Sequence, residues 1–153
     1  GGTTNEVELA IRAHLKPEPR VEFGRRLGEL GLATAMIDVS DGLAQDLAHI
    51  CEASGVGALI DFYAVPIAEA LSLVTKDDEA AFDFAVNGGE DFELLFTAQR
   101  RKTKAIGKLA ESCGLTVTEI GEIQPPTSHA PVWVARGCLV TELPIRGYDH
   151  FAV

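Results

Sequence analysis

Apolar and polar positions follow two different periods along the chain, and together they predict both helices and strands. Apolar residues spaced three and four apart are typical of helices with one buried face, whereas short alternating or continuous apolar runs are typical of strands. The helical period predicts helices over residues 5–15, 21–30, 43–51, 78–86 and 101–113, with a short helix over 66–71. Strands are predicted over residues 33–39, 58–62, 91–97 and 116–123, and residues 132–134 and 138–140 fit a hairpin.

This mixture of elements predicts an α+β fold. Helices and strands alternate without a glycine-rich phosphate loop of either common type, GxGxxG or GxxxxGK[ST], so neither a dinucleotide-binding fold nor a P-loop enzyme is indicated. We expect a mixed, mostly antiparallel sheet with helices packed on it. Residues 1–153 are expected to form a single domain.

Composition narrows the class of protein. The chain has 153 residues, of which 46% are hydrophobic and 24% charged, as in a globular domain. Its 13 basic and 23 acidic residues give a formal charge of -10, which argues against nucleic acid or an anionic membrane as a partner. The three cysteines are far apart and suggest neither a disulfide framework nor a zinc site, so a reducing cytoplasm is the expected compartment.

The most informative stretch is the turn between the strand at 33–39 and the helix that follows. Ser40, Asp41 and Gly42 form this turn, where a helix N-terminus would suit a phosphate group. However, Asp38 and Asp41 would each repel a phosphate about 4 Å away by roughly 4 kcal/mol at an effective dielectric constant of 20, against about 1 kcal/mol from the helix end. A divalent cation such as Mg²⁺ between them would reverse the sign. The alternative is that Asp41 only caps the helix and Asp38 faces water.

A second acidic turn spans residues 87–91, Asn-Gly-Gly-Glu-Asp. Its two glycines would let a ligand approach the backbone closely, or they would simply end the preceding helix. The four histidines share no spacing typical of a metal pair, and His49 is expected on the solvated side of its helix. Tyr148 fits either a stacking platform for a flat ring or a plug packed on the domain.

Four segments together resemble one known family. The chain resembles the C-terminal domain of thiamine-monophosphate kinases over about residues 10–151. The segments that carry the resemblance are MIDVSDGLAQDLAHI, HLKPEPR, NGGEDFELLFT and the final GYDHF. These kinases belong to the group that includes aminoimidazole ribonucleotide synthetase and selenophosphate synthetase. Two positions depart from the family pattern: Phe92 stands where Tyr is common, and Tyr148 stands where Trp or Phe is frequent.

The resemblance implies transfer of the ATP γ-phosphate to thiamine phosphate, giving thiamine diphosphate, with Mg²⁺ and without a covalent enzyme intermediate. It implies that Asp38 and Asp41 bind Mg²⁺, that Ser40 contacts ATP, and that Glu90 and Tyr148 bind the thiamine substrate. No residue is assigned as a catalytic group. The family fold would be the C-terminal domain of the aminoimidazole ribonucleotide synthetase type.

The resemblance also implies partners. The family's N-terminal domain, which carries much of the ATP site and the dimer interface, lies outside this sequence, so the chain alone is expected to be inactive and the full-length protein to be a homodimer. Two alternatives stay open. One is a related ATP-dependent synthetase with another substrate, and the other is a non-catalytic module whose acidic turns hold a metal for structure only.

Overall fold

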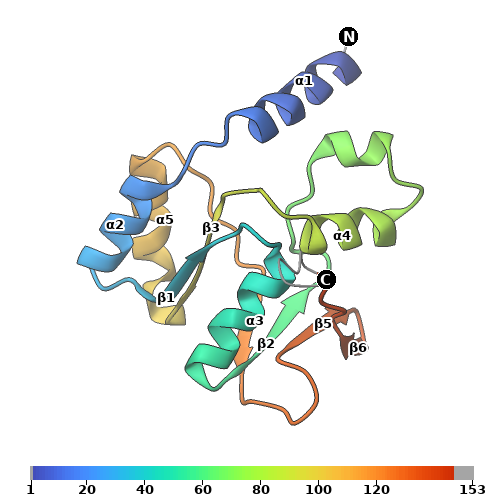
Figure 1. Ribbon diagram of the computed structural model, residues 1–153. Helices are drawn as coiled ribbons and strands as arrows, with labels where there is room; N and C mark the ends of the chain where they lie inside the picture. Colours follow the sequence, from blue (N-terminus) through green and yellow to red (C-terminus); the bar gives the residue numbers. More distant parts are fainter. Residues whose placement is uncertain (1, 147–153) are drawn as a thin grey trace, which may run out of the picture.

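The computed structural model describes residues 2–146, which form five α-helices, two short 3₁₀ helices and six strands (Figure 1). The α-helices are α1 (Gly2–Leu15), α2 (Val21–Glu29), α3 (Leu43–Ser54), α4 (Asp78–Asn87) and α5 (Thr103–Ser112). The 3₁₀ helices are η1 (Glu69–Leu73) and η2 (Arg100–Lys102). The strands are β1 (Ala33–Asp38), β2 (Gly57–Asp61), β3 (Leu94–Ala98), β4 (Gly121–Gln124), β5 (Val132–Arg136) and β6 (Leu139–Glu142).

The described strands form two sheets. β1 pairs with β3 in an antiparallel ribbon, and the other four lie in the order β4-β2-β5-β6. In the larger sheet β2 and β5 run parallel, while the β2–β4 and β5–β6 pairs are antiparallel. The predicted fold class, a mixed and mostly antiparallel α+β arrangement, is therefore confirmed, with the strands divided between two sheets.

The buried apolar side chains form two clusters, a smaller one at the β1–β3 ribbon and a larger one at the four-stranded sheet. α2 and α5 lie side by side against the β1–β3 ribbon and contribute Phe23, Leu27, Ile106 and Leu109 to the smaller cluster (Figure 1). α3 packs on β2 and β5 of the four-stranded sheet, α4 packs on α3, and both helices contribute to the larger cluster. Its members include Leu47, Cys51, Ile60, Phe62, Phe82, Val86 and Val132.

Helix α3 occupies the central place in this arrangement. Four residues separate it from the end of β1, and it packs against β1 and β3 on one side and against β2, β5 and α4 on the other. The turn that leads into α3 consequently lies where the ribbon, α3 and the end of α4 come together. This is the place for which the sequence predicted binding chemistry.

Two predicted strands are shorter than expected. The strand predicted over 91–97 begins only at Leu94, because Glu90 and Phe92 have positive φ angles of 71° and 50°, which extended backbone does not allow. The strand predicted over 116–123 is reduced to Gly121–Gln124. Its partner β2 has only five residues, so the ladder between them cannot extend further.

Several other elements test the sequence-based expectations. The short helix predicted over 66–71 is the 3₁₀ helix Glu69–Leu73, and the predicted hairpin is present, with Gly137 and Cys138 in its turn. Helix α1 lies beside η1 at the edge of the molecule, and its side chains Val7, Ile11 and Leu15 are exposed. None of the helices within residues 2–146 is both long and apolar enough to cross a membrane.

Candidate functional site

The first acidic turn begins directly where β1 ends. Asp38 is the last residue of β1 and is exposed, Val39 is buried, and Ser40 and Asp41 are half-buried. The N-cap of α3 is Gly42, at a φ of 121°. Gly42 therefore occupies the N-cap position for which the sequence offered Asp41.

The N–H groups of this turn are held by a buried carboxylate. Asp46, one turn into α3 and only 2% exposed, accepts hydrogen bonds through Oδ2 from the Ser40 N–H at 3.0 Å and the Asp41 N–H at 3.1 Å. These two donors therefore point into the protein. Neither of these N–H groups is therefore available to a phosphate bound at this turn.

The second acidic turn packs backbone to backbone against the first. The Glu90 N–H donates to the Ser40 carbonyl at 2.9 Å, the Phe92 N–H donates to the Val39 carbonyl at 2.8 Å, and the Val39 N–H donates to the Glu93 carbonyl at 2.8 Å. These bonds continue the β1–β3 pairing beyond its regular part. Ser40, Asp41 and Glu90 are thereby brought into one place from positions 50 residues apart in the sequence.

Glycines make this contact possible. A Cβ atom on Gly89 would lie 2.7 Å from the Ser40 carbonyl oxygen, and one on Gly42 would lie 3.2 Å from the carbonyl group of Asn87. Gly88 ends α4 with extended rather than left-handed angles (φ -71°, ψ 131°), so it does not have the left-handed conformation of a common glycine C-cap. The close approach predicted for a ligand at this turn is made by the protein's own backbone.

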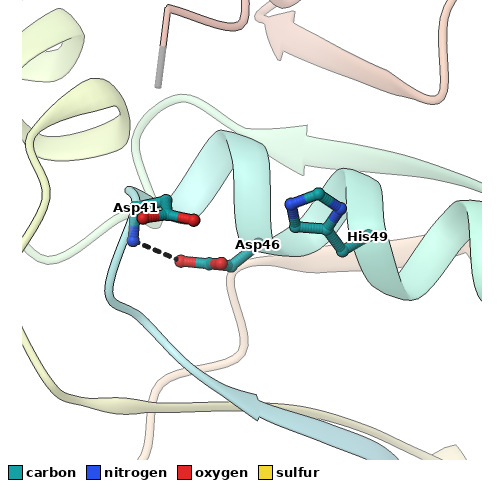
Figure 2. A group of neighbouring side chains, drawn as sticks. All are labelled: Asp41, Asp46 and His49. Atoms are coloured by element: carbon teal, nitrogen blue, oxygen red, sulfur yellow. Dashed lines mark hydrogen bonds between the residues drawn. The ribbon is translucent and has the colours of Figure 1, made fainter. Parts of the chain in front are cut away.

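Three potential metal ligands converge at the start of α3. The carboxylates of Asp41 and Asp46 and the imidazole of His49 have ligand atoms that all lie within 4.8 Å of one another, and Figure 2 shows them on the same side of the helix. Asp38 does not belong to this group. Carboxylate oxygens and an imidazole nitrogen are ligands that divalent cations use in proteins, so the donor set of this turn fits such a cation.

The sequence prediction did not include Asp46 in the site, and it did not place His49 near the two carboxylates. His49 is exposed, as expected, but it also faces the two carboxylates. A signal for Asp46 existed: it lies three residues after Leu43 and one before Leu47, on the side of the helix that the apolar residues predict to be buried. An acidic residue at a core-facing position in the first turns of a helix needs nearby N–H groups, and the preceding turn supplies them.

Charged groups surround the second turn. Arg20 donates two hydrogen bonds to Glu93, at 2.9 and 2.7 Å, and this pairing raises the pKa of Arg20. Asp91 is an exposed residue, yet its pKa is raised. The larger cause is partial desolvation of its carboxyl group, and the smaller cause is the negative charge of the nearby Glu93. Arg25, by contrast, pairs with Glu22 and Glu29 on its own exposed helix face.

The C-terminal end of the described chain is fixed close to this turn. The Arg146 N–H donates to the side-chain oxygen of Asn87 at 2.9 Å, and the Arg146 guanidinium pairs with Asp83 at 3.0 Å. Asn87 is the last residue of α4, immediately before Gly88 and Gly89. Tyr148, expected to bind the thiamine substrate, lies outside the described residues.

A fold of this kind, with two acidic turns joined at the start of a central helix, has known relatives. Residues 2–134 match the family described as AIR synthase related protein, C-terminal domain, and the chain belongs to this family. Within it, the chain is similar to the thiamine-monophosphate kinases. It is 39% identical to that of Salmonella typhimurium (strain LT2) over 147 residues, covering 96% of this chain and 44% of the relative.

Solved structures agree with this relationship. A crystal structure of thiamine-monophosphate kinase from Stenotrophomonas maltophilia K279a superposes with a TM-score of 0.72 at 41% identity, covering 82% of this chain and 38% of that one. A structure of AaThiL complexed with AMPPCP and TMP has a TM-score of 0.71 at 29% identity, covering 94% of this chain and 42% of that one. The chain spans less than half the length of these relatives. The resemblance noted from the sequence is confirmed.

Proposed function

We propose that the chain is the C-terminal part of an enzyme that phosphorylates thiamine phosphate to thiamine diphosphate, with ATP as donor and Mg²⁺ as cofactor. The observation that carries the proposal is the hydrogen bond from the Glu90 N–H to the Ser40 carbonyl at 2.9 Å, which joins the two acidic turns. This contact places Ser40 and Asp41, which suit a metal–nucleotide site, next to Glu90, which suits the binding of a second substrate. Similarity to thiamine-monophosphate kinases, and to a relative in complex with AMPPCP and TMP, supports these substrates.

Each proposed site residue within residues 2–146 has a role that its place in the fold supports, whereas the role of Tyr148 rests on the resemblance alone. Asp38 and Asp41 would hold Mg²⁺ from the end of β1 and from the turn, and the Ser40 hydroxyl would contact the ATP phosphates. Glu90 would face thiamine phosphate from the second turn, and Tyr148 would stack on its flat ring. The metal, when bound, would neutralise the phosphate charge that these carboxylates would otherwise repel. Catalysis would then be positioning and charge neutralisation, without a covalent intermediate.

The partners of the chain are also part of the proposal. The apolar side chains of α1, among them Val7, Leu9, Ile11 and Leu15, are exposed on a helix at the edge of the molecule. This exposure supports an additional domain that completes the ATP site in the full-length protein, which we propose to be a cytoplasmic homodimer. The isolated chain would then be inactive.

The proposal is tested by ADP release from the full-length protein, with thiamine phosphate or an aminoimidazole-pathway substrate as acceptor. We expect turnover only with thiamine phosphate, ATP and Mg²⁺. Asp38→Asn and Asp41→Asn should each lower kcat at least a hundredfold at moderate Mg²⁺ concentration, because each removes a proposed metal ligand. Glu90→Gln should mainly raise the KM for thiamine phosphate.

The outcomes separate the alternatives. If another acceptor supports turnover and thiamine phosphate does not, the protein is a related ATP-dependent synthetase with that acceptor as its substrate. Full activity of Asp38→Asn and Asp41→Asn would contradict the metal site and favour a non-catalytic role for the turns. Glu22→Gln on the exposed face of α2 is the control, since the charge that it removes is paired with Arg25 on the same helix and is not a proposed ligand; activity should be unchanged.

A further inference from the structure

Asp46 is the one buried charged residue among those that the structure describes. It is 2% exposed, and its Oδ2 atom accepts hydrogen bonds from two successive N–H groups, those of Ser40 and Asp41. Burial of a carboxylate costs free energy unless hydrogen bonds or an opposite charge compensate it. No lysine or arginine forms an ion pair with Asp46 within residues 2–146.

The shape of the turn needs only an acceptor at this position, not a charge. An asparagine side-chain oxygen at the same place could accept both N–H groups, as the carboxylate does. The negative charge is therefore not explained by the hydrogen bonds alone. The Asp41 carboxylate has an oxygen within 4.8 Å of the Asp46 carboxylate, so a divalent cation held by Asp41 would be attracted by both charges.

We propose that Asp46 is a positioning residue for cation binding. It holds the Ser40–Asp41 turn in its binding conformation before a metal arrives, and its buried charge increases the affinity of Asp41 for a divalent cation. The inference rests on the proposed function for the identity of the metal. It goes beyond that function in assigning a role to a residue that need not touch ATP or thiamine phosphate.

The geometry in Figure 2 supports both parts of this role. The hydrogen bond to the Asp41 N–H ties the backbone of Asp41 to α3, while the carboxylate of Asp41 extends toward Asp46 and His49. A cation bound by Asp41 would lie about 2 Å from its oxygen, and so within roughly 3–7 Å of the Asp46 carboxylate. Even in the dielectric constant of bulk water, a unit charge about 5 Å from a divalent ion changes binding about tenfold.

The test measures the turn directly by amide hydrogen exchange in the full-length protein, resolved to Ser40 and Asp41, as Mg²⁺ is added without ATP. In wild-type protein we expect both amides to be protected before any Mg²⁺ is present, and Mg²⁺ to add further protection. Asp46→Asn should keep the initial protection but raise the half-saturating Mg²⁺ concentration about tenfold. Asp46→Ala should lose the initial protection as well.

Glu52→Gln provides the matched control, because it removes a negative charge from an exposed position on the same helix. Its Mg²⁺ response should equal that of wild type. In turnover assays, Asp46→Asn should recover kcat at high Mg²⁺ with an unchanged KM for thiamine phosphate, a pattern that a merely unfolded variant would not give.

Three results would overturn the inference. They are free exchange of the Ser40 and Asp41 amides in metal-free wild type, no response of these amides to Mg²⁺, and a wild-type Mg²⁺ response in Asp46→Asn. The first two need no variant, so they decide the matter even if substitution of Asp46 prevents folding. Loss of the proposed kinase activity in wild type would be seen separately, as absence of turnover with thiamine phosphate.

Discussion

The contact between the two acidic turns depends on Gly89, and substitution of this residue measures how much the contact contributes. In Gly89→Ala the new Cβ would lie 2.7 Å from the Ser40 carbonyl oxygen, whereas carbon and oxygen atoms approach to about 3.3 Å even in the shortest favourable contacts. The atoms it meets belong to the backbone of Ser40 and Asp41, so no side-chain rotation can make room. The turns must separate by roughly 0.6 Å or more.

The expected cost follows from two terms. Overpacking of this kind costs about 1–3 kcal/mol, and weakening the hydrogen bond from the Glu90 N–H to the Ser40 carbonyl costs about 1 kcal/mol. We therefore expect Gly89→Ala to lower the free energy of unfolding by about 2–4 kcal/mol. Because Ser40, Asp41 and Glu90 move apart, activity of the full-length protein should fall even at temperatures where the variant stays folded.

The assay is denaturant unfolding of the full-length protein, with two glycine variants as controls. In Gly107→Ala the new methyl group meets nothing within 4 Å in the middle of α5, so the variant should be unchanged or more stable by up to about 1 kcal/mol. In Gly55→Ala there is also free space, but the φ of 64° is unfavourable for alanine, with an expected cost of about 1 kcal/mol. Gly89→Ala should lose more stability than either control variant.

A Gly89→Ala protein with wild-type stability and wild-type turnover would refute the reasoning. It would mean that the two backbones can separate without cost and that their contact does not position the site. A loss equal to that of Gly55→Ala would also count against it, because the effect would then match a general penalty for removing a glycine from a turn.

Two further substitutions probe the charges around the second turn. Arg20→Gln removes both hydrogen bonds to Glu93. Because the Glu93 side chain is 58% exposed, we expect the free energy of unfolding to fall by only about 0.5–1 kcal/mol, and by less in 0.5 M salt. An equal loss of stability at low and high salt would contradict an ionic origin. The raised pKa of Asp91 means that the folded state binds this proton more tightly than the unfolded state, so wild-type stability should fall as pH rises from about 4 through the raised pKa. Asp91→Asn removes this pH dependence. In denaturation experiments at a series of pH values, the variant should therefore become more stable relative to wild type as pH rises over that range. A stability difference that does not change with pH would show that Asp91 does not cause the pH dependence.

The elements of the fold could be predicted because most of their boundaries carry a local signal. Gly55 ends α3 in the left-handed conformation, with a φ of 64°. Asp77 begins α4 by accepting a hydrogen bond from the Ala80 N–H at 2.8 Å. Such signals depend on a few neighbouring residues, so the sequence alone is enough to find them.

The pairing of the strands could not be predicted in the same way. Apolar alternation indicates that a segment is a strand, but it does not say which other strand it joins. β1 pairs with β3, more than 50 residues away, and is not part of the sheet of β2. For this reason the two acidic turns were interpreted as separate ligand-binding features, although their main contact is with each other.

The candidate site was predictable to the extent that it follows residue type. Asp38, Asp41, Ser40 and Glu90 attract attention because acidic and hydroxyl groups beside glycines at element ends are typical of binding sites. Asp46 does not, because it lies inside a helix among apolar neighbours. Its importance appears only when the two N–H groups that it holds are seen to belong to the turn before the helix.

The two acidic turns bring several carboxylates together through their backbones. They are joined by hydrogen bonds between neutral backbone groups, while Arg20 pairs with Glu93 and Arg146 pairs with Asp83. Backbone bonds fix the distances between carboxylates without reducing their charge, so the repulsion among them persists in the folded protein. If the proposed function holds, a divalent cation relieves this repulsion on binding. The glycine contact and the Asp46 hydrogen bonds would then determine cation affinity as well as stability, since both hold the same carboxylates close together.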